Sequence, residues 1–282
     1  MAPRRRRKKN RSIIYTLIIV FLLSVLIGSA TFAYKYMFED RYVQVNSTTK
    51  IWDTPSDGEK SSYPPQQQPN TRVFGYNKSA GKVVALTFDD GPIPEYTKKY
   101  IDILKSMEVK ATFFVIDKNA QKHPELLKYI YENGNEIGLH SYSHFNMSKM
   151  KPEQMVEELY KTQKIVVEST GVKPILFRPP YGAFNKTLLE ISDALGLHVV
   201  LWNVDPDDWR SPAVENVVNR VISHTKNGSV ILMHEGKTNT LAALPQIMEK
   251  LKSEGYSFVT VSELLNYEKN NIANNNQEQQ KD

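Results

Sequence analysis

Short apolar runs alternate with amphipathic stretches between Gly81 and Tyr267. Seven of the apolar runs have the length of buried strands, and turn-forming or charged residues follow them. The predicted strands are Val83–Asp90, Ala111–Ile116, Glu136–Ser143, Ile175–Arg178, His198–Asp205, Ser229–His234 and Tyr256–Thr260.

Six stretches between these strands have the pattern of helices. Pro152 begins the longest of them and Gly171 ends it, and Ser211 precedes another as a predicted N-cap. The predicted helices are Glu95–Met107, Asn119–Asn133, Lys151–Thr170, Asn185–Leu195, Pro212–Lys226 and Thr240–Ser253.

Strands that alternate with helices predict parallel βα units, and hence an α/β fold. The region has about 185 residues, which is short for eight full units. We therefore expect a distorted, incomplete (β/α) barrel of about seven parallel strands rather than an open doubly wound sheet. No Gly-x-Gly-x-x-Gly or Walker motif follows a strand, so nucleotide and dinucleotide binding lose their main support.

The N-terminal part of the chain has a different composition. Seven Arg and Lys residues and no acid lie within residues 1–11, and residues 12–34 contain no charged side chain. Such an apolar stretch can cross a bilayer core of about 30 Å, and the positive-inside rule places residues 1–11 in the cytoplasm. We expect an uncleaved signal-anchor at 12–34, with a signal peptide cleaved near Ala33 as the alternative.

The segments on either side of the predicted domain are polar. Residues 35–80 include the Pro- and Gln-rich stretch Ser61–Asn70 and predict a flexible extracellular linker. Residues 268–282, rich in Asn and Gln, predict a disordered tail. We therefore expect a single-pass protein of the cell membrane whose folded domain, residues 81–267, faces the cell wall.

Charge and cysteine content restrict the partners of that domain. The formal net charge of +5 comes from the N-terminus, because the rest of the chain has 29 Lys and Arg against 31 Asp and Glu. A near-neutral body gives no support for a nucleic-acid partner. The chain has no cysteine, so a bound metal must use His, Asp or Glu.

Polar clusters end five of the predicted strands. A parallel βα barrel builds its active site at the carboxyl ends of its strands, so these clusters are expected to meet. The clusters are Asp89–Asp90, His140–His144, Arg178–Gly182, Asp205–Trp209 and Leu232–His234.

Two histidines and one carboxylate can form a metal site with open positions. Here the candidates are His140, His144 and Asp90. This ligand set suits a catalytic Zn²⁺ with water in the open position, and it also suits non-haem Fe(II). Taken singly, a hydrogen-bonded core histidine and a solvated Asp-Asp-Gly turn are the alternatives.

Together these segments resemble the five ordered motifs of the polysaccharide deacetylases, the family 4 carbohydrate esterases or NodB-homology enzymes. The similarity covers about Lys82–Leu265. It implies a NodB-type distorted (β/α) barrel, a divalent metal, usually Zn²⁺ and sometimes Co²⁺, and hydrolysis of N-acetyl groups on amino sugars. The matching segments are Thr87-Phe88-Asp89-Asp90-Gly91, His140-Ser141-x-x-His144, Arg178-x-Pro180-Tyr181, Asp205-x-x-Asp208-Trp209 and Leu232-x-His234.

The resemblance implies a role for each motif residue. Asp90, His140 and His144 match the metal ligands. Asp89 matches the general base, which Arg178 keeps ionised and oriented; an ordinary salt bridge is the alternative for Arg178.

The remaining motif residues match groups that handle the substrate. His234 resembles the general acid that protonates the leaving amine, with Asp208 supporting its charged form. The backbone N–H of Tyr181 matches a donor to the oxyanion. Trp209 and Leu232 match the apolar walls around the acetyl methyl group, with plain core packing as the alternative.

Location and family together suggest the substrate. For a domain held outside the membrane of a bacterium, the nearest polymer of N-acetylated amino sugars is peptidoglycan, so we expect deacetylation of its N-acetylglucosamine. Chitin oligosaccharides or another exported polysaccharide are the alternative substrates. A catalytically inactive wall-binding module is the alternative of a different class.

Overall fold

A computed structural model of the chain describes residues 73–267. Within them, seven strands form one parallel sheet in the order β5-β4-β3-β2-β1-β6, with β7 paired to β1, which confirms the predicted α/β class. The strands are β1 (Val83–Gly91), β2 (Thr112–Val115), β3 (Glu136–Leu139), β4 (Leu176–Phe177), β5 (His198–Val199), β6 (Val230–His234) and β7 (Ser257–Phe258).

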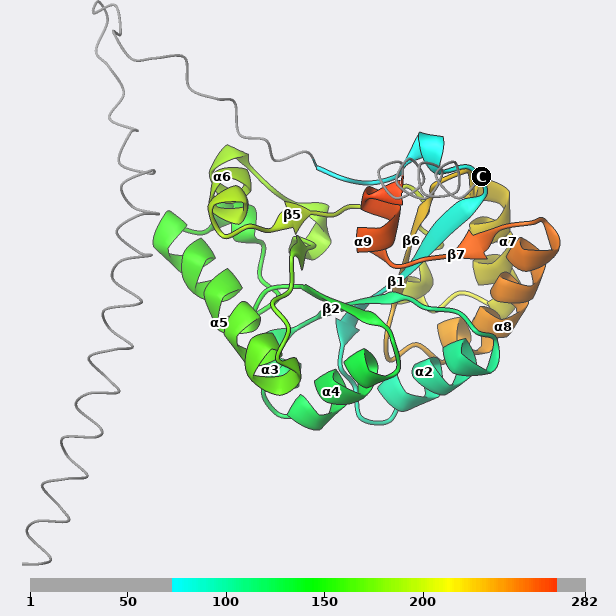
Figure 1. The fold of residues 1–282 in the computed structure, drawn as a ribbon, viewed down its shortest axis with the longest axis horizontal. Helices are drawn as coiled ribbons and strands as arrows, with labels where there is room; N and C mark the ends of the chain where they lie inside the picture. The colour runs from blue at the N-terminus through cyan, green and yellow to red at the C-terminus, as the bar shows by residue number, and fades with distance from the viewer. Residues whose placement is uncertain (1–72, 268–282) are drawn as a thin grey trace, which may run out of the picture. The chain divides into compact units, whose positions relative to one another are not determined.

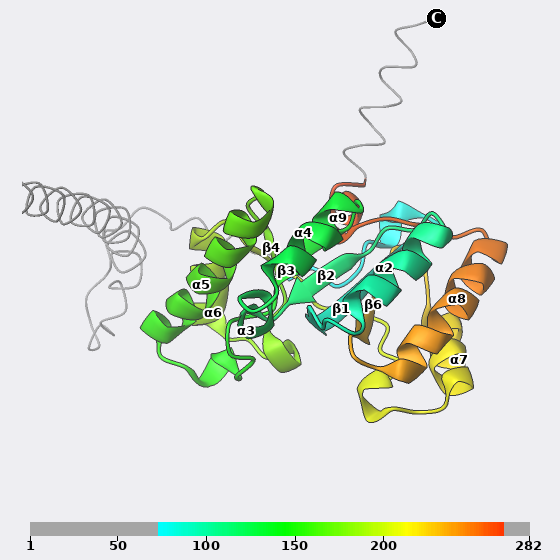
Figure 2. The same cartoon turned by 90° about the horizontal axis from the view of Figure 1, so that it is seen from below.

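Helices surround the sheet, as Figures 1 and 2 show: α2 and α4 lie along one side, α5 and α6 at one end, and α7 and α8 at the other. Their bounds are α2 (Thr97–Ser106), α3 (Asp117–Ala120), α4 (Pro124–Glu132), α5 (Pro152–Thr170), α6 (Lys186–Ala194), α7 (Val214–His224), α8 (Thr238–Ser253) and α9 (Val261–Leu265). Four 3₁₀ helices join them: η2 (Lys78–Ala80), η3 (Met147–Lys149), η4 (Pro180–Gly182) and η5 (Asp208–Arg210).

An irregular segment links the two outer strands of this sheet. After β5 the chain continues to Val204, which forms a parallel bridge with Ile231 of β6. The N–H of Leu232 donates to the carbonyl of Val204 at 2.9 Å. This link fits a distorted, incomplete barrel, and it lays the segment that follows β5 alongside β6.

The fold differs from the prediction in the helices. The predicted helix 119–133 is two helices, because Pro124 has no N–H to continue the first one and instead begins α4. The predicted N-cap Ser211 lies outside α7, whose N-cap is Ala213.

The domain also begins before residue 81. Phe74 forms a bridge with Val200, and Tyr76 forms one with Ser229. The predicted linker, residues 35–80, is therefore too long at its C-terminal end. Two isolated aromatic residues in a polar stretch give no periodic pattern from which their pairing with the domain could be predicted.

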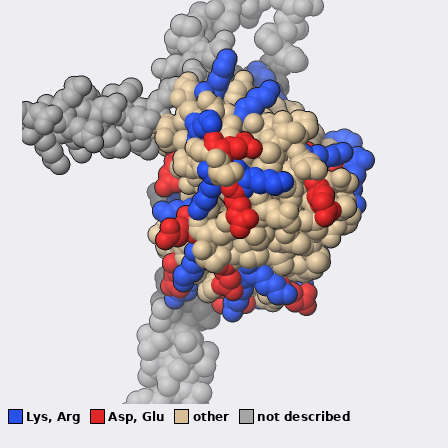
Figure 3. All heavy atoms as spheres, turned by 90° about the vertical axis from the view of Figure 1, so that its right-hand side faces the viewer, with Lys and Arg blue, Asp and Glu red and all other residues tan. Residues whose placement is uncertain are grey.

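The N-terminal and C-terminal predictions concern other parts of the chain. The basic tail 1–11, the anchor 12–34, the linker up to residue 72 and the tail 268–282 lie outside the described residues. No helix within residues 73–267 is both long and apolar enough to cross a bilayer. On the face that carries α7 and α8, Figure 3 shows basic and acidic side chains interspersed among uncharged ones.

A glycine in β3 makes room for an aromatic ring at the centre of the sheet. Gly138 pairs in register with Phe114 of β2. A Cβ at position 138 would lie 2.5 Å from two atoms of the Phe114 ring. The guanidinium of Arg178 lies 4.1 Å from the centroid of the same ring. The ring therefore has little freedom to move away from a larger residue.

We expect Gly138→Ala to lower the free energy of unfolding by about 1–3 kcal/mol, because the added methyl group overpacks the ring. Urea titration of the full chain would measure the change. Gly75→Ala is the matched control: a Cβ there would meet its nearest atom at 3.7 Å, so its effect should stay within about 0.5 kcal/mol. Equal stability of the two variants would show that the ring is not confined.

Candidate active site

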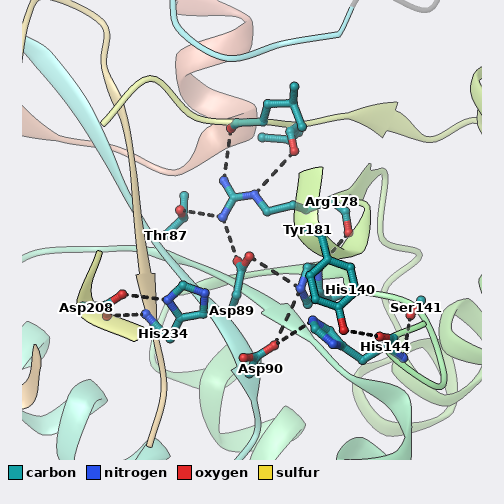
Figure 4. A network of polar contacts seen from close by, with 12 residues as sticks. Thr87, Asp89, Asp90, His140, Ser141, His144, Arg178, Tyr181, Asp208 and His234 are labelled. Carbon is teal, nitrogen blue, oxygen red and sulfur yellow. Dashed lines mark hydrogen bonds and ion pairs between the residues drawn. The ribbon is translucent and has the colours of Figure 1, made fainter. Parts of the chain in front are cut away.

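Three predicted metal ligands converge at the carboxyl ends of β1 and β3 (Figure 4). Asp90 Oδ1 lies 3.3 Å from His144 Nε2 and 3.7 Å from His140 Nε2. One ligand atom from each residue can be chosen so that all three lie within 4.8 Å of one another. The Nδ1–H of His140 donates to the carbonyl oxygen of Arg178 at 2.7 Å, which leaves Nε2 to face the site.

The backbone bends sharply to present these groups. Asp90, Ser141, His144 and Tyr181 have φ angles of 72°, 67°, 59° and 61°. This left-handed region is unfavourable for residues with a side chain and costs about 1–3 kcal/mol each. A regular strand would point the side chains of Asp89 and Asp90 to opposite faces of the sheet. The bend at Asp90 allows both carboxylates to face the same site.

Asp89 is held by a buried arginine. Arg178 has no exposed surface, and its Nη1 donates to Asp89 Oδ1 at 2.7 Å and to Thr87 Oγ1 at 2.8 Å. The rest of the guanidinium donates to main-chain carbonyls, with Nη2 3.2 Å from Leu201 O. Burial lowers the pKa of Arg178, and the charge of Asp89 opposes that shift. The two groups therefore form a buried, hydrogen-bonded ion pair.

His234 is paired with a second buried carboxylate. Its Nδ1 lies 2.7 Å from Asp208 Oδ1, and its backbone N–H donates to Asp208 Oδ2. Thr240 also donates to Asp208 Oδ2. Burial alone lowers the pKa of His234, but the hydrogen bond and charge of Asp208 outweigh it, and the pKa is raised above its ordinary value. The site thus favours the imidazolium form of His234.

A cavity of about 510 Å³ joins these groups. Eight of the ten predicted site residues line it, while Arg178 and Asp208 lie buried behind Asp89 and His234. The lining residues are Asp89, Asp90, His140, His144, Tyr181, Trp202, Asp205, Trp209, Leu232 and His234. The structure therefore brings all ten predicted residues to one place.

Two residues at or next to the site, Trp202 and Glu235, are not predicted from the sequence. Trp202 lines the cavity. Glu235, next to His234, is 2% exposed and accepts a hydrogen bond from Thr97, while its other carboxyl oxygen has no hydrogen-bond partner within residues 73–267. Burial is the main cause that raises the pKa of Glu235 to about 8. An acid directly after the motif histidine was a visible signal for Glu235, whereas Trp202 lies outside every motif.

The donor set fits a divalent cation. Asp90 Oδ1 is shielded from solvent and accepts no hydrogen bond from the described residues, although two imidazole nitrogens face it. Burial and the neighbouring His140 lower the pKa of His144, which favours the neutral ring that a metal needs. Two imidazoles and one carboxylate leave coordination positions open. Asp90, His140 and His144 would hold the ion.

Comparison with known proteins agrees with this arrangement. A family model described as polysaccharide deacetylase matches residues 76–200. The chain is 40% identical over 191 residues to a peptidoglycan-N-acetylglucosamine deacetylase of Bacillus cereus, a match that covers 66% of this chain and 89% of that protein. It is 38% identical over 204 residues to the peptidoglycan-N-acetylmuramic acid deacetylase PdaC of Bacillus subtilis, which covers 71% of this chain and 43% of PdaC.

One similar solved structure is that of a pseudoenzyme. It is a pseudoenzyme of carbohydrate esterase family 4 from Bacillus anthracis, 31% identical, with a TM-score of 0.67 over 69% of each chain. Similarity of fold alone therefore does not establish catalysis in this group. The matched segment, the relatives and the converged motifs together identify the chain as a member of the polysaccharide deacetylase family.

Proposed function

We propose that the protein is a metal-dependent N-deacetylase that removes acetyl groups from N-acetylglucosamine in peptidoglycan. The observation that carries this proposal is the solvent-shielded Asp90 Oδ1 between two imidazole nitrogens, with the Asp89–Arg178 pair beside it. The choice of polymer is supported by the named activities of the Bacillus relatives.

The metal of this proposal is Zn²⁺, with Co²⁺ or another divalent ion as a substitute. A bound divalent ion supplies Lewis-acid chemistry, because it polarises a carbonyl and makes water more acidic. Asp90, His140 and His144 supply the ligand atoms. Arg178 holds Asp89 Oδ1, and Asp89 Oδ2 lies 3.6 Å from His140 Nε2, so Asp89 would stand next to the ion as a base rather than as a fourth ligand.

Asp89 acts as the general base. The buried guanidinium of Arg178 pairs with the carboxylate and fixes its orientation. It accepts a proton from the water that attacks the acetyl carbon. Such a positioned base contributes on the order of 10²–10⁴ to the rate.

His234 acts as the general acid. Its Nδ1–H is engaged by Asp208, so Nε2 is the atom that donates a proton to the nitrogen of the breaking C–N bond. The amide is thereby split into a free amine on the sugar and acetate that contains the oxygen of the water. The raised pKa of His234 keeps a proton available near neutral pH.

Three further residues bind the substrate. Trp209 and Leu232 line the cavity and provide apolar surface for the acetyl methyl group. The main-chain N–H of Tyr181 stabilises the negative charge that develops on the carbonyl oxygen. The left-handed conformation of Tyr181 supports this role, because strained backbone is typical of functional sites.

Chitin oligosaccharides and N-acetylmuramic acid are the competing substrates, the second because PdaC acts on it by name. The competing function is that of an inactive wall-binding module. The Bacillus anthracis pseudoenzyme shows that a protein of this fold can be without activity. The presence of a base, an acid and a complete ligand set around one cavity favours the enzyme.

The proposed location follows from the first 34 residues. A basic segment and an uncharged segment of membrane-spanning length would anchor the chain in the membrane with the domain outside. This orientation would place the cavity next to the cell wall.

The direct test is acetate release by the zinc-loaded full chain from peptidoglycan and from chitooligosaccharides in parallel. We expect release from peptidoglycan, and free amines on its glucosamine residues by mass spectrometry of muramidase fragments. Free amines on muramic acid instead would show that N-acetylmuramic acid, and not N-acetylglucosamine, is the substrate. Absence of acetate from both polymers would leave the inactive module as the explanation.

Two substitutions should separate chemistry from metal binding. Asp89→Asn should lower turnover on the order of 10²-fold or more while zinc binding stays close to wild type, because Asp89 is not a ligand. His140→Ala should lose both. Zinc content, acetate release and circular dichroism of each variant are the measurements. Near wild-type turnover in Asp89→Asn would reject Asp89 as the base.

Asp208→Asn should shift the pH profile. Because Asp208 raises the pKa of His234, its removal lowers that pKa, and the imidazolium is lost at a lower pH. The alkaline limb of kcat/KM should therefore move to lower pH. Asp207→Asn is the control, since Asp207 pairs with Arg220 instead. A uniform loss of rate with both limbs unmoved would argue against His234 as the acid.

A further inference from the structure

The turn that carries His144 is held in an unfavourable backbone conformation. It follows β3 and contains two left-handed residues, Ser141 and His144. Inside the turn, the Ser141 hydroxyl accepts a hydrogen bond from the His144 N–H at 3.0 Å. This single local bond has to oppose strain of about 1–3 kcal/mol at each of the two residues. Contacts from outside the turn are therefore needed to hold it.

Glu158 on α5 supplies two of these contacts. Its Oε2 accepts the main-chain N–H of Tyr142 at 2.9 Å and that of Ser143 at 2.8 Å. Bonds from N–H groups to a charged carboxylate are about twice as strong as neutral ones. The neighbouring residues Met155 and Leu159 of the helix are buried in the core, so the carboxylate is presented from a rigid element.

The opposite side of the turn is tied to α3. The N–H of Asp117 donates to the carbonyl of Ser141 at 3.1 Å. From the same short helix, the side-chain amide of Asn119 donates to the carbonyl of Asp90 at 3.0 Å. The backbones of Asp90 and of the turn that carries His144 are thus both hydrogen-bonded to α3. Glu158 of α5 binds the same turn from another side.

The acid at position 158 has an electrostatic cost. Asp117 is fully buried and its carboxyl oxygens have no hydrogen-bond partner among the described residues. Burial, and next the charge of Glu158, raise the pKa of Asp117 to about 7. A local conflict of this kind is expected where function, rather than stability, sets the residue.

We propose that Glu158 is a positioning residue for the metal centre: by accepting the N–H groups of Tyr142 and Ser143, it fixes the turn that aims His144 Nε2 at Asp90 Oδ1. The inference rests on the proposed metal site and adds to it a residue that touches neither metal nor substrate. Groups that orient metal ligands typically account for 10–100-fold in affinity.

The test is the Zn²⁺ dissociation constant of the full chain, measured by competition with a chromophoric chelator. Glu158→Ala should weaken zinc binding about tenfold or more. Glu158→Gln should stay within about threefold of wild type, because its amide oxygen can accept the same two N–H groups. Glu157→Ala should leave the constant unchanged, since Glu157 is exposed and pairs with Lys161.

A residue that only stabilises the fold would behave differently. Its removal would lower the melting temperature of the zinc-free protein and leave the zinc constant unchanged, and that result with Glu158→Ala would overturn the inference. If Glu158→Ala does not fold, Glu158→Asp takes its place, because the shortened carboxylate cannot reach both N–H groups; a folded Glu158→Asp with wild-type zinc affinity would overturn the inference equally. Absence of zinc binding by the wild-type chain would instead reject the proposed metal site itself.

Discussion

The ion pair between Asp89 and Arg178 is the interaction on which the rest of the site depends. Both groups are buried, and a buried charge is tolerated only when it is paired and fully hydrogen-bonded. Arg178 meets that condition with Asp89, Thr87 and main-chain carbonyls, while its guanidinium lies over the Phe114 ring. Because its own carbonyl also accepts from His140, the same residue positions the proposed base and one of the proposed metal ligands.

Around this pair the fold places strained loops on a rigid sheet. At or after the carboxyl ends of the strands, the backbone adopts left-handed conformations at Asp90, Ser141, His144 and Tyr181. The cost of these bends is offset by contacts from neighbouring elements, of which Glu158 and Asn119 are two. The His234–Asp208 pair is built in the same way, because a buried carboxylate favours the charged imidazole.

Sequence predicted the parts of this arrangement that follow from strand ends. The apolar runs located all seven strands, and the polar clusters after them contained the ten site residues that the fold brings together. Hydrogen bonds from side chains to the main chain, such as those of Glu158, could not be predicted this way. Many residue types can accept from a main-chain N–H group, so no sequence motif marks the one that does. The domain starts early because Phe74 pairs with Val200, a contact between residues far apart in the sequence. The helix breaks at Pro124 because proline has no N–H group to donate. The spacing of hydrophobic residues reveals neither of these.

The central claim is that Asp90, His140 and His144 converge on one divalent ion beside the Asp89–Arg178 pair. Anomalous diffraction at the zinc edge from crystals of the zinc-loaded protein tests it most directly. The account predicts a single strong peak within coordination distance of Asp90 Oδ1 and the Nε2 atoms of both histidines, with Asp89 bound to Arg178 and not to the ion. A peak held by other residues, or none at this position, would contradict it.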